Sequence, residues 1–353
     1  MKILVTGGAG FIGSAFIRYV LANSQDEIFN LDALTYAGNL DSLPISDSDA
    51  HRYQFARINI CDAAAVIAAV YQFKPDYVIN FAAESHVDRS ITGPADFIQT
   101  NVLGVFTLLE ACRGYWQGLM PEKKAKFRFL QVSTDEVFGD LPLDMPPFNE
   151  SSPFDPSSPY SASKAAADHL VSAWYRTYGL PVLSTFCSNN YGPYQFPEKL
   201  IPRLLTCALK GDPLPVYGDG GQIRDWLYVV DHVEALYEVL THAPAGERFA
   251  IGGGNEKTNL EVVNILCDLL EELAPNKPKG IRHYRDLICF VDDRPGHDRR
   301  YAIDSSKIEQ WRGKNSKVDF HTGVRSTVAW YLSNSDWCDR VLSKEYLMNN
   351  DKI

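Results

Sequence analysis

Residues 5–14, VTGGAGFIGS, join an apolar strand-like run to a helix-like run through a loop rich in glycine. Gly8, Gly10 and Gly13 satisfy G-x-G-x-x-G, and Gly7 with Gly10 and Gly13 satisfies the wider G-x-x-G-x-x-G. Glycines let the backbone approach a pyrophosphate, whose charge is stabilised by the free N–H groups at the start of the helix. In the first strand-turn-helix of a chain this pattern predicts a dinucleotide site, and the alternative is a purely structural turn.

Two polar residues at the ends of the next strand-like runs refine this prediction. Asp32 follows Gly13 by about twenty residues, where a carboxylate accepts hydrogen bonds from an adenosine ribose. A carboxylate there repels a 2′-phosphate, so the sequence favours NAD over NADP; the alternative is an aspartate that caps a helix or turn. Asn59 is a candidate to bind the adenine amino group through its amide oxygen.

Strand-like and helix-like segments alternate through the first half of the chain. We expect strands at residues 2–6, 27–32, 53–60, 77–83, 126–134 and 181–187, and helices at 12–22, 62–73, 96–116 and 160–178. Strands that are apolar on both faces and separated by helices indicate a parallel sheet covered on both sides. The predicted fold is therefore an α/β, doubly wound, Rossmann-like domain.

The composition changes beyond about Asn189, where Pro and Gly become denser. We predict an NAD-binding domain at residues 1–188 and a smaller, mainly substrate-binding domain at 189–353. Residues 225–253 contain a helix-like and a strand-like segment, which we expect to return to the main sheet.

The composition also limits the partners. The 353-residue chain has a net charge of -10 and no Lys/Arg-rich run, so neither nucleic acid nor a membrane surface is a predicted partner. The seven cysteines show no CxxC spacing and the eight histidines no H-E-x-x-H, so no metal site is expected. Without a predicted signal peptide or membrane span, we expect a soluble cytoplasmic protein with reduced thiols.

Tyr160 and Lys164, in PYSASK at residues 159–164, are one helical turn apart. A neighbouring ammonium and a cationic nicotinamide both lower the pKa of a phenol, which then accepts a proton from a hydroxyl as hydride leaves the same carbon. Pro159 suits the first turn of the helix. The alternative is a packing tyrosine next to a solvated lysine.

VSTDEVFG, residues 132–139, ends an apolar run with Thr134, Asp135 and Glu136. Adjacent carboxyls split their titrations, so one stays protonated and can donate while the other is ionised and can accept. Side chains alternate along a straight strand, so both acids reach one ligand only if the chain turns here, and Gly139 is compatible with a turn. The alternative is that Asp135 caps a loop and Glu136 is a surface acid.

The motifs TGGAGFIG, STDEVFG, YSASK and NNYGP occur in the order typical of extended short-chain dehydrogenases, which the chain resembles from residue 1 to about 308. Together with AESHVDRSI, GDGGQIRDWLYVVDH and RPGHDRRYAID they resemble the dTDP-glucose 4,6-dehydratase family within that group. Epimerases of the group usually have small residues in place of the two acids. The resemblance also implies a homodimer, paired through residues 96–116 and the helix of Tyr160.

The resemblance implies a reaction in three steps on dTDP-glucose, with NAD as the cofactor. Tyr160 and NAD oxidise C4 of the hexose, while Lys164 holds the phenol and the ribose and Thr134 binds the 4-hydroxyl. Glu136 then removes the C5 proton, and protonated Asp135 donates to the departing 6-hydroxyl. Hydride returns to C6 as C5 is reprotonated, which gives a 4-keto-6-deoxy sugar.

The resemblance also implies a set of binding residues. The cofactor contacts are Gly7, Gly10, Phe11, Ile12, Gly13, Asp32, Ala33, Leu34, Thr35, Asn59, Ile60, Phe81, Ala82, Ala83, Ser85, Thr100, Tyr160, Lys164 and Asn190. The substrate contacts are Ser85, Thr134, Asn189, Lys199, Leu200, Pro215, Tyr217, Arg224, Asn259, Arg294, His297 and Tyr301. Most members have Asp where Asn59 stands. Arg224 and Arg294 suit a diphosphate, and the alternative for each is a structural ion pair.

Two other functions fit part of this pattern. One is a UDP-sugar 4-epimerase, a decarboxylase or another UDP- or GDP-sugar enzyme on the same scaffold, which the acid pair argues against. The other is a dinucleotide-sensing module without catalysis, which would have no need of Tyr160 and Lys164. The sequence leaves open thymidine or uridine as the base, the pathway, and the role of residues beyond about 308.

Overall fold

The computed structural model describes residues 1–343 except 294 and 315–316. Its centre is a seven-stranded parallel sheet in the order β10-β6-β5-β4-β1-β2-β3. The strands are β1 Lys2–Thr6, β2 Glu27–Asp32, β3 Tyr53–Arg57, β4 Tyr77–Asn80, β5 Arg128–Thr134, β6 Val182–Cys187 and β10 Arg248–Ile251. The predicted doubly wound parallel sheet is confirmed.

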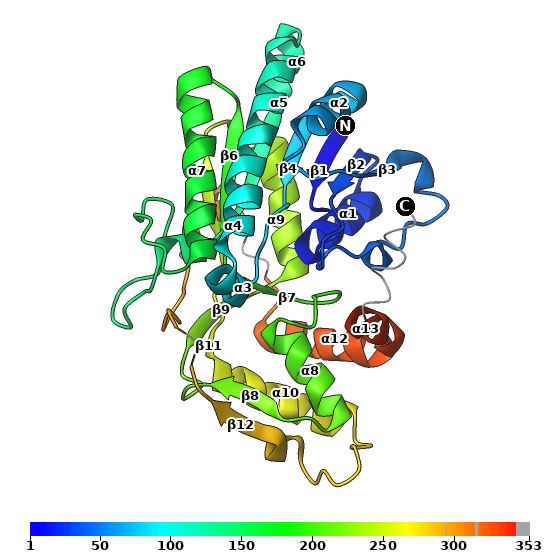
Figure 1. The fold of residues 1–353 in the computed structure, drawn as a ribbon, viewed down its shortest axis with the longest axis vertical. Coiled ribbons are helices and arrows are strands. Elements are labelled where there is room, and N and C mark those ends of the chain that lie inside the picture. Colours follow the sequence, from blue (N-terminus) through cyan, green and yellow to red (C-terminus); the bar gives the residue numbers. More distant parts are fainter. Residues whose placement is uncertain (294, 315–316, 344–353) are drawn as a thin grey trace.

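Helices cover both faces of this sheet (Figure 1). On one face α1 (Phe11–Asn23) packs against α9 (Val229–His242), and on the other α2 (Ala63–Phe73), α5 (Val105–Gln117) and α7 (Pro159–Tyr178) lie side by side. In the described part of the chain, no helix combines the length and the hydropathy that crossing a bilayer needs.

Strand β1 shows why the strands are apolar on both faces. Ile3 and Val5 belong to the core beneath α1 and α9, whereas Leu4 belongs to the core beneath α2 and α5. All three side chains are fully buried, which contributes about 1.5–3 kcal/mol each. Because the strands are parallel, their carboxyl ends meet at one edge of the sheet. The strand order reverses between β1 and β4, and doubly wound folds bind ligands at such a reversal.

The helix predicted at residues 96–116 is not a regular α-helix. The π-helical segment η3 (Ile98–Gly104) joins α4 (Pro94–Phe97) to α5. Within η3 the buried Asn101 exchanges hydrogen bonds with the backbone of Glu84, and its Nδ2 donates to Ser163 Oγ at 2.8 Å. These tertiary bonds favour the wider turn, which sequence periodicity cannot reveal.

The second half of the chain forms a smaller region (Figure 1, bottom). Its strands β11 (Glu256–Thr258), β9 (Ile223–Tyr228) and β7 (Asn189–Tyr191) form one sheet, and β12 (Ile288–Val291) pairs with β8 (Leu214–Tyr217) in another. The segment 225–253 thus divides: β9 belongs to the smaller region, whereas α9 packs on the main sheet and β10 joins it.

The remaining elements are short or belong to the smaller region. Its helices are α8 Leu200–Lys210, α10 Asn259–Leu273, α12 Phe320–Ser333, α13 Ser335–Leu342 and the short η5 Tyr284–Leu287. Helix α11 (Ser306–Arg312) packs against β10 of the main sheet. The short elements elsewhere are α3 Val87–Thr92, α6 Pro121–Lys126, η1 Leu40–Ser42, η2 Ala50–Arg52 and η4 Asp135–Phe138.

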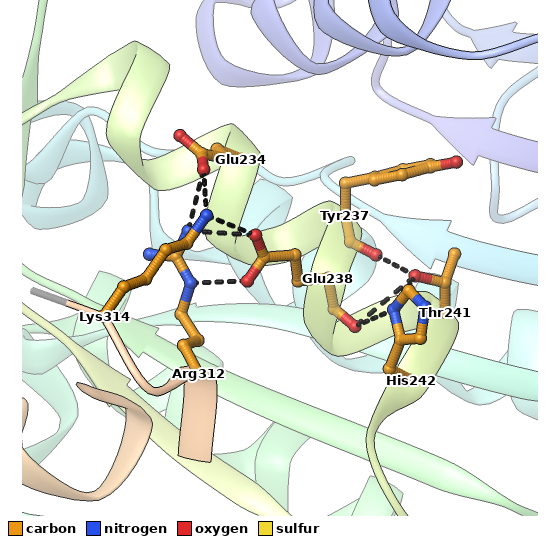
Figure 2. A network of polar contacts seen from close by, with 7 residues as sticks. All are labelled: Glu234, Tyr237, Glu238, Thr241, His242, Arg312 and Lys314. Carbon is orange, nitrogen blue, oxygen red and sulfur yellow. Dashed lines mark hydrogen bonds and ion pairs between the residues drawn. The ribbon is translucent and has the colours of Figure 1, made fainter. Parts of the chain in front are cut away.

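An ionic cluster fixes the segment after α11 to the main domain. Figure 2 shows Arg312 and Lys314 directed at Glu234 and Glu238 on α9. Arg312 Nε lies 2.6 Å from Glu238 Oε2, and Lys314 Nζ lies 2.7 Å from Glu238 Oε1. Two cations and two carboxylates balance in charge, so the cluster joins residues far apart in sequence without leaving a net charge.

Gly323 in α12 permits a close contact with Tyr191 in the core of the smaller region. A Cβ atom at Gly323 would lie 2.2 Å from the hydroxyl oxygen of Tyr191, which is fully buried against Phe320 and Trp226. Exposed Gly114 in α5 is a matched control, because its nearest atom would be 3.5 Å away.

We predict that Gly323→Ala lowers the free energy of unfolding by about 1–3 kcal/mol, since the added methyl group overpacks the core. Gly114→Ala should leave this energy unchanged or raise it by up to about 1 kcal/mol, through helix propensity. Urea unfolding followed by circular dichroism measures both. Equal effects of the two substitutions would contradict the close packing of α12 against Tyr191.

Candidate active site

The chain turns immediately after β5, and this turn brings the acid pair together. Thr134 ends the strand and η4 (Asp135–Phe138) follows without a break, ended by Gly139 at φ +86°. The Thr134 hydroxyl caps the turn by accepting a hydrogen bond from the Glu136 N–H at 3.3 Å. The alternation of a straight strand therefore stops at Thr134, as the predicted proximity of Asp135 and Glu136 requires.

A cavity of about 280 Å³ lies at this turn, at the carboxyl edge of the sheet. It is lined by the glycine loop, the end of β5, the first turn of α7 and residues 187–199. It brings together the five residues predicted to act in catalysis: Thr134, Asp135, Glu136, Tyr160 and Lys164. Two larger surface hollows near α7 and β10, of about 450 and 550 Å³, contain none of these residues.

Helix α7 holds Tyr160 and Lys164 in the cavity wall. Pro159 occupies its first position, and Ser158 and Ser161 cap it by reciprocal hydrogen bonds. Both functional side chains are buried, and Lys164 Nζ donates to the carbonyl oxygen of Val132 at 2.8 Å. Burial lowers the pKa of Lys164, and the charge of Asp168, one turn further along α7, opposes that shift.

The electrostatics of the cavity separate the two acids. Burial raises the pKa of Asp135 well above its usual value, and the charges of Glu136 and Asp225 raise it further. Burial, followed by the charge of Glu136, also raises the pKa of Tyr160, which a hydrogen bond with Thr134 opposes. Asp135, with 2% of its surface exposed, is thus the member of the pair whose protonated form is favoured by its surroundings.

The glycine loop fits a dinucleotide pyrophosphate. Gly10 stands before α1, and no side chain caps the first N–H groups of that helix. Gly7 has φ +70°, and a Cβ atom there would lie 2.5 Å from the Ala82 nitrogen, so only glycine fits. Uncapped N–H groups at the wall of a cavity are suitable donors for phosphate oxygens.

An adjoining cavity of about 100 Å³ continues from Gly7 toward the end of β2. The predicted cofactor residues that line one or both cavities are Gly7, Gly10, Phe11, Ile12, Gly13, Asp32, Ala33, Thr35, Asn59, Ile60, Phe81, Ala82, Ala83, Ser85, Thr100, Tyr160, Lys164 and Asn190. Leu34 lines neither; its N–H donates to Asp32 Oδ1 at 2.8 Å.

Asp32 and Asn59 already have backbone partners. Asp32 Oδ2 accepts a hydrogen bond from the Ala9 N–H at 2.8 Å, which ties the acid to the glycine loop. Burial raises the pKa of Asp32, and its backbone hydrogen bonds oppose that shift. Asn59 Oδ1 accepts from the Cys61 N–H at 2.9 Å. Each oxygen retains a second lone pair for a ligand.

The predicted substrate residues divide into two groups. Ser85, Asn189 and Lys199 line the main cavity with Thr134, and Lys199 Nζ donates to the Ser85 carbonyl oxygen at 3.1 Å. The predicted residues that do not line it are Leu200, Pro215, Tyr217, Arg224, Asn259, His297 and Tyr301. Arg294 lies outside the described residues.

Two residues that do not line the cavity, Arg224 and Tyr301, still interact electrostatically with the acid pair. The Arg224 guanidinium, 4.4 Å from the Tyr301 ring centre, opposes the raised pKa of Asp135. Burial raises the pKa of Tyr301, and the charge of Glu136 raises it further. Arg224 and Tyr301 therefore connect the smaller region to the acid pair electrostatically, although they do not line the cavity.

Sequence reasoning missed three buried polar residues around the site. Asn101 joins Glu84 to Ser163, and Asp225 contributes to the raised pKa of Asp135. Asp168 accepts a hydrogen bond from Ser133 Oγ at 2.6 Å and faces Lys164. Only Asp168 had a sequence signal, since it follows Lys164 by one helical turn.

Comparisons with known proteins agree with this geometry. A family model described as GDP-mannose 4,6 dehydratase matches residues 4–327. A protein of Neisseria meningitidis serogroup B named dTDP-glucose 4,6-dehydratase is 57% identical over 345 residues, which cover 98% of this chain and 97% of that one.

Solved structures include two useful neighbours. A dTDP-glucose 4,6-dehydratase from Streptomyces venezuelae, crystallised with NAD and dTDP, is 44% identical with a TM-score of 0.86 and covers 97% of this chain and 100% of that one. A UDP-glucose 4-epimerase from Thermus thermophilus, crystallised with NAD, is 31% identical with a TM-score of 0.81, covering 95% and 100%.

The acid pair, the Tyr160–Lys164 helix and the glycine loop thus occur in one cavity of a chain whose relatives match it over nearly its whole length. The chain belongs to the family of the dTDP-glucose 4,6-dehydratases, within the larger family that the GDP-mannose 4,6 dehydratase model describes.

Proposed function

We propose that the protein converts dTDP-glucose into dTDP-4-keto-6-deoxyglucose and water, with NAD as a cofactor that ends each cycle as it began. The observation that carries the proposal is the presence of Asp135, Glu136 and Tyr160 in one buried cavity. The relatives named dTDP-glucose 4,6-dehydratase, and the Streptomyces structure with NAD and dTDP, support the choice of substrate and cofactor.

The two regions of the chain have separate tasks in this proposal. Residues 1–188, with α9 and β10, hold NAD, and most of residues 189–353 bind the nucleotide sugar. The N-terminus of α1 binds the pyrophosphate, and Asp32 accepts hydrogen bonds from the adenosine ribose. When bound, NAD takes a hydride from C4 of the sugar and returns it to C6.

Tyr160 accepts the proton of the 4-hydroxyl during the oxidation of C4. A buried phenol has a raised pKa, so it needs a nearby positive charge to act as a base. Lys164, one turn further along α7, supplies that charge. The Thr134 hydroxyl, in the same cavity wall as the phenol, orients the 4-hydroxyl between them.

The acid pair then removes water across C5 and C6. The new ketone at C4 acidifies the C5 hydrogen, which Glu136 removes. Asp135, kept protonated by burial and by the charge of Glu136, donates its proton to the departing 6-hydroxyl. Glu136 finally returns a proton to C5, which leaves a 4-keto-6-deoxy sugar.

The acid pair also distinguishes this function from the two alternatives. A 4-epimerase returns hydride to C4 and keeps the 6-hydroxyl, so it has no use for a protonated acid at C6. A dinucleotide sensor needs neither the acids nor the buried Lys164. Burying the Asp135 carboxyl has an energetic cost. Of the three candidate functions, only dehydration uses this carboxyl.

The direct test uses dTDP-glucose with deuterium at C4 and no added NAD. We predict a 4-keto-6-deoxy product with deuterium at C6 of the same molecule, because hydride never leaves the cavity. UDP-glucose and GDP-mannose serve as comparisons, and each should be converted more slowly. A product that retains the 6-hydroxyl, or one whose deuterium is lost to solvent, would contradict the proposed function.

We also propose that the protein acts in the cytoplasm. The support is its seven cysteines, all of which are free thiols in the structure. Unpaired cysteines are typical of a reducing compartment.

We further propose a homodimer formed through an apolar surface of η3, α5 and α7, which we call the α5/α7 face. Its members Ile98, Leu103, Phe106 and Tyr178 are 43–48% exposed. Phe106 contacts Trp174, which contacts Tyr178, so the side chains of α5 and α7 form one continuous surface. Large exposed apolar surfaces of this kind mark interfaces.

We predict that Phe106→Glu converts the protein from dimer to monomer, because a charge is expensive in a buried interface. Ile67→Glu on α2, at a side chain with a similar exposure of 45%, is the control and should stay dimeric. Sedimentation velocity at micromolar concentration measures both. A monomeric parent protein, or a Phe106→Glu variant that remains dimeric, would refute the proposed interface.

A further inference from the structure

The proposed reaction, on which this inference rests, ends every turnover with an extra proton on Tyr160 and a missing proton on Asp135. Tyr160 gains the proton of the 4-hydroxyl and does not return it, because C4 remains a ketone. Asp135 loses a proton, which departs in the water molecule. Glu136 is different, since it takes a proton from C5 and later gives one back. The enzyme is ready again only when Tyr160 has lost a proton and Asp135 has gained one.

The Thr134 hydroxyl lies between these two groups. Its Oγ1 donates to Asp135 Oδ1 at 3.3 Å. Thr134 and Tyr160 also line the same cavity, and Thr134 is near enough to the phenol to lower its pKa. A distance of 3.3 Å is long for two oxygens, but catalytic hydrogen bonds often tighten only once substrate is bound. The Thr134 hydroxyl is thus placed to connect the phenol to the carboxyl.

These three groups have little contact with solvent. Asp135 is 2% exposed, and Thr134 and Tyr160 are each 8% exposed, before any ligand covers them. Within the described part of the chain, the buried Asp135 Oδ2 has no hydrogen-bond partner, whereas Oδ1 contacts Thr134, so Oδ2 keeps its hydrogen-bonding capacity for the 6-hydroxyl. Each carboxyl oxygen of Asp135 therefore has its own task.

We propose that the Thr134 hydroxyl returns the proton from Tyr160 to Asp135 after each turnover. Thr134 gives its own hydrogen to Asp135 Oδ1 and takes the phenolic hydrogen of Tyr160. One O–H bond forms on the carboxyl and one breaks on the phenol, while threonine is unchanged and the negative charge moves from carboxylate to phenolate. No solvent proton is needed.

The chemistry of a hydroxyl explains why threonine can do this. A hydroxyl has one hydrogen and two lone pairs, so it donates to only one of its two neighbours at a time. Before the reaction it accepts from protonated Asp135 and donates toward the phenolate. After the reaction it accepts from the phenol and donates to the carboxylate, as the contact of its Oγ1 with Asp135 Oδ1 allows. Reversing these two hydrogen bonds is the proton transfer.

The test compares the first turnover with later ones in the holoenzyme, by rapid quench with excess dTDP-glucose. Thr134→Val removes the hydroxyl at nearly constant shape, Thr134→Ala is a second variant in case the first fails to fold, and Thr134→Ser keeps the hydroxyl. We expect Val or Ala to form one product per site and then to turn over at least tenfold more slowly. Thr134→Ser and the parent protein should show no such burst.

An infrared spectrum recorded directly after the burst gives an independent readout. The band of a protonated Asp135 carboxyl should be missing in the Val or Ala variant and present in the Ser variant. Added imidazole, a small proton carrier, should speed the later turnovers of the variants without the hydroxyl.

Two failures are distinguishable. The proton-return proposal is overturned if the folded Val and Ala variants are equally slow in the first and later turnovers. It is also overturned if these folded variants form no product at all, because Thr134 would then serve only the chemical steps. If the parent protein itself makes no 4-keto product, the proposed function fails instead.

Discussion

The turn after β5 is the constraint on which the rest of the site depends. It places Asp135 and Glu136 together in the wall of one cavity. Burial raises the pKa of Asp135 well above its usual value, and the charge of Glu136 raises it further, so the protonated form of Asp135 is favoured. In the proposed function, this difference lets Asp135 donate a proton while Glu136 accepts one.

The parallel sheet makes this arrangement possible. The glycine loop follows β1, the acid pair follows β5, and Asn189 and Asn190 follow β6, so all three reach the same carboxyl edge. Helix α7 then returns over β5 with Tyr160 in its first turn. Cofactor residues and acids meet because parallel strands end together, and the smaller region closes the cavity over them.

The sequence predicted the features that depend on local chemistry. The fold class, the loop at residues 5–14, and the capped helix of Tyr160 all follow from periodicity, glycine and proline. The need for a turn at Asp135 or Glu136 followed from strand geometry, given that both acids reach one ligand. The sequence did not reveal η3, whose Asn101 is held by distant partners, nor Asp225, which belongs to β9. These depend on tertiary contacts that no local pattern encodes.

The substrate residues show the same limit. Ser85, Asn189 and Lys199 line the cavity, but Arg224 is buried and donates to the backbone carbonyls of Ile223 and Asp298. The resemblance to the family predicted which residues bind the substrate. The direction of their side chains, however, depends on the packing of the smaller region. The contacts of Arg224 and Tyr301 with a nucleotide therefore stay predictions.

The central physical claim is that Asp135 holds its proton at neutral pH. Infrared difference spectra between the parent protein and Asp135→Asn test it without substrate. We predict a protonated-carboxyl band that belongs to Asp135 and persists as pH rises from 5 through 7, because its pKa lies well above the usual value. A band that disappears near pH 4, as for an exposed aspartic acid, would contradict this account.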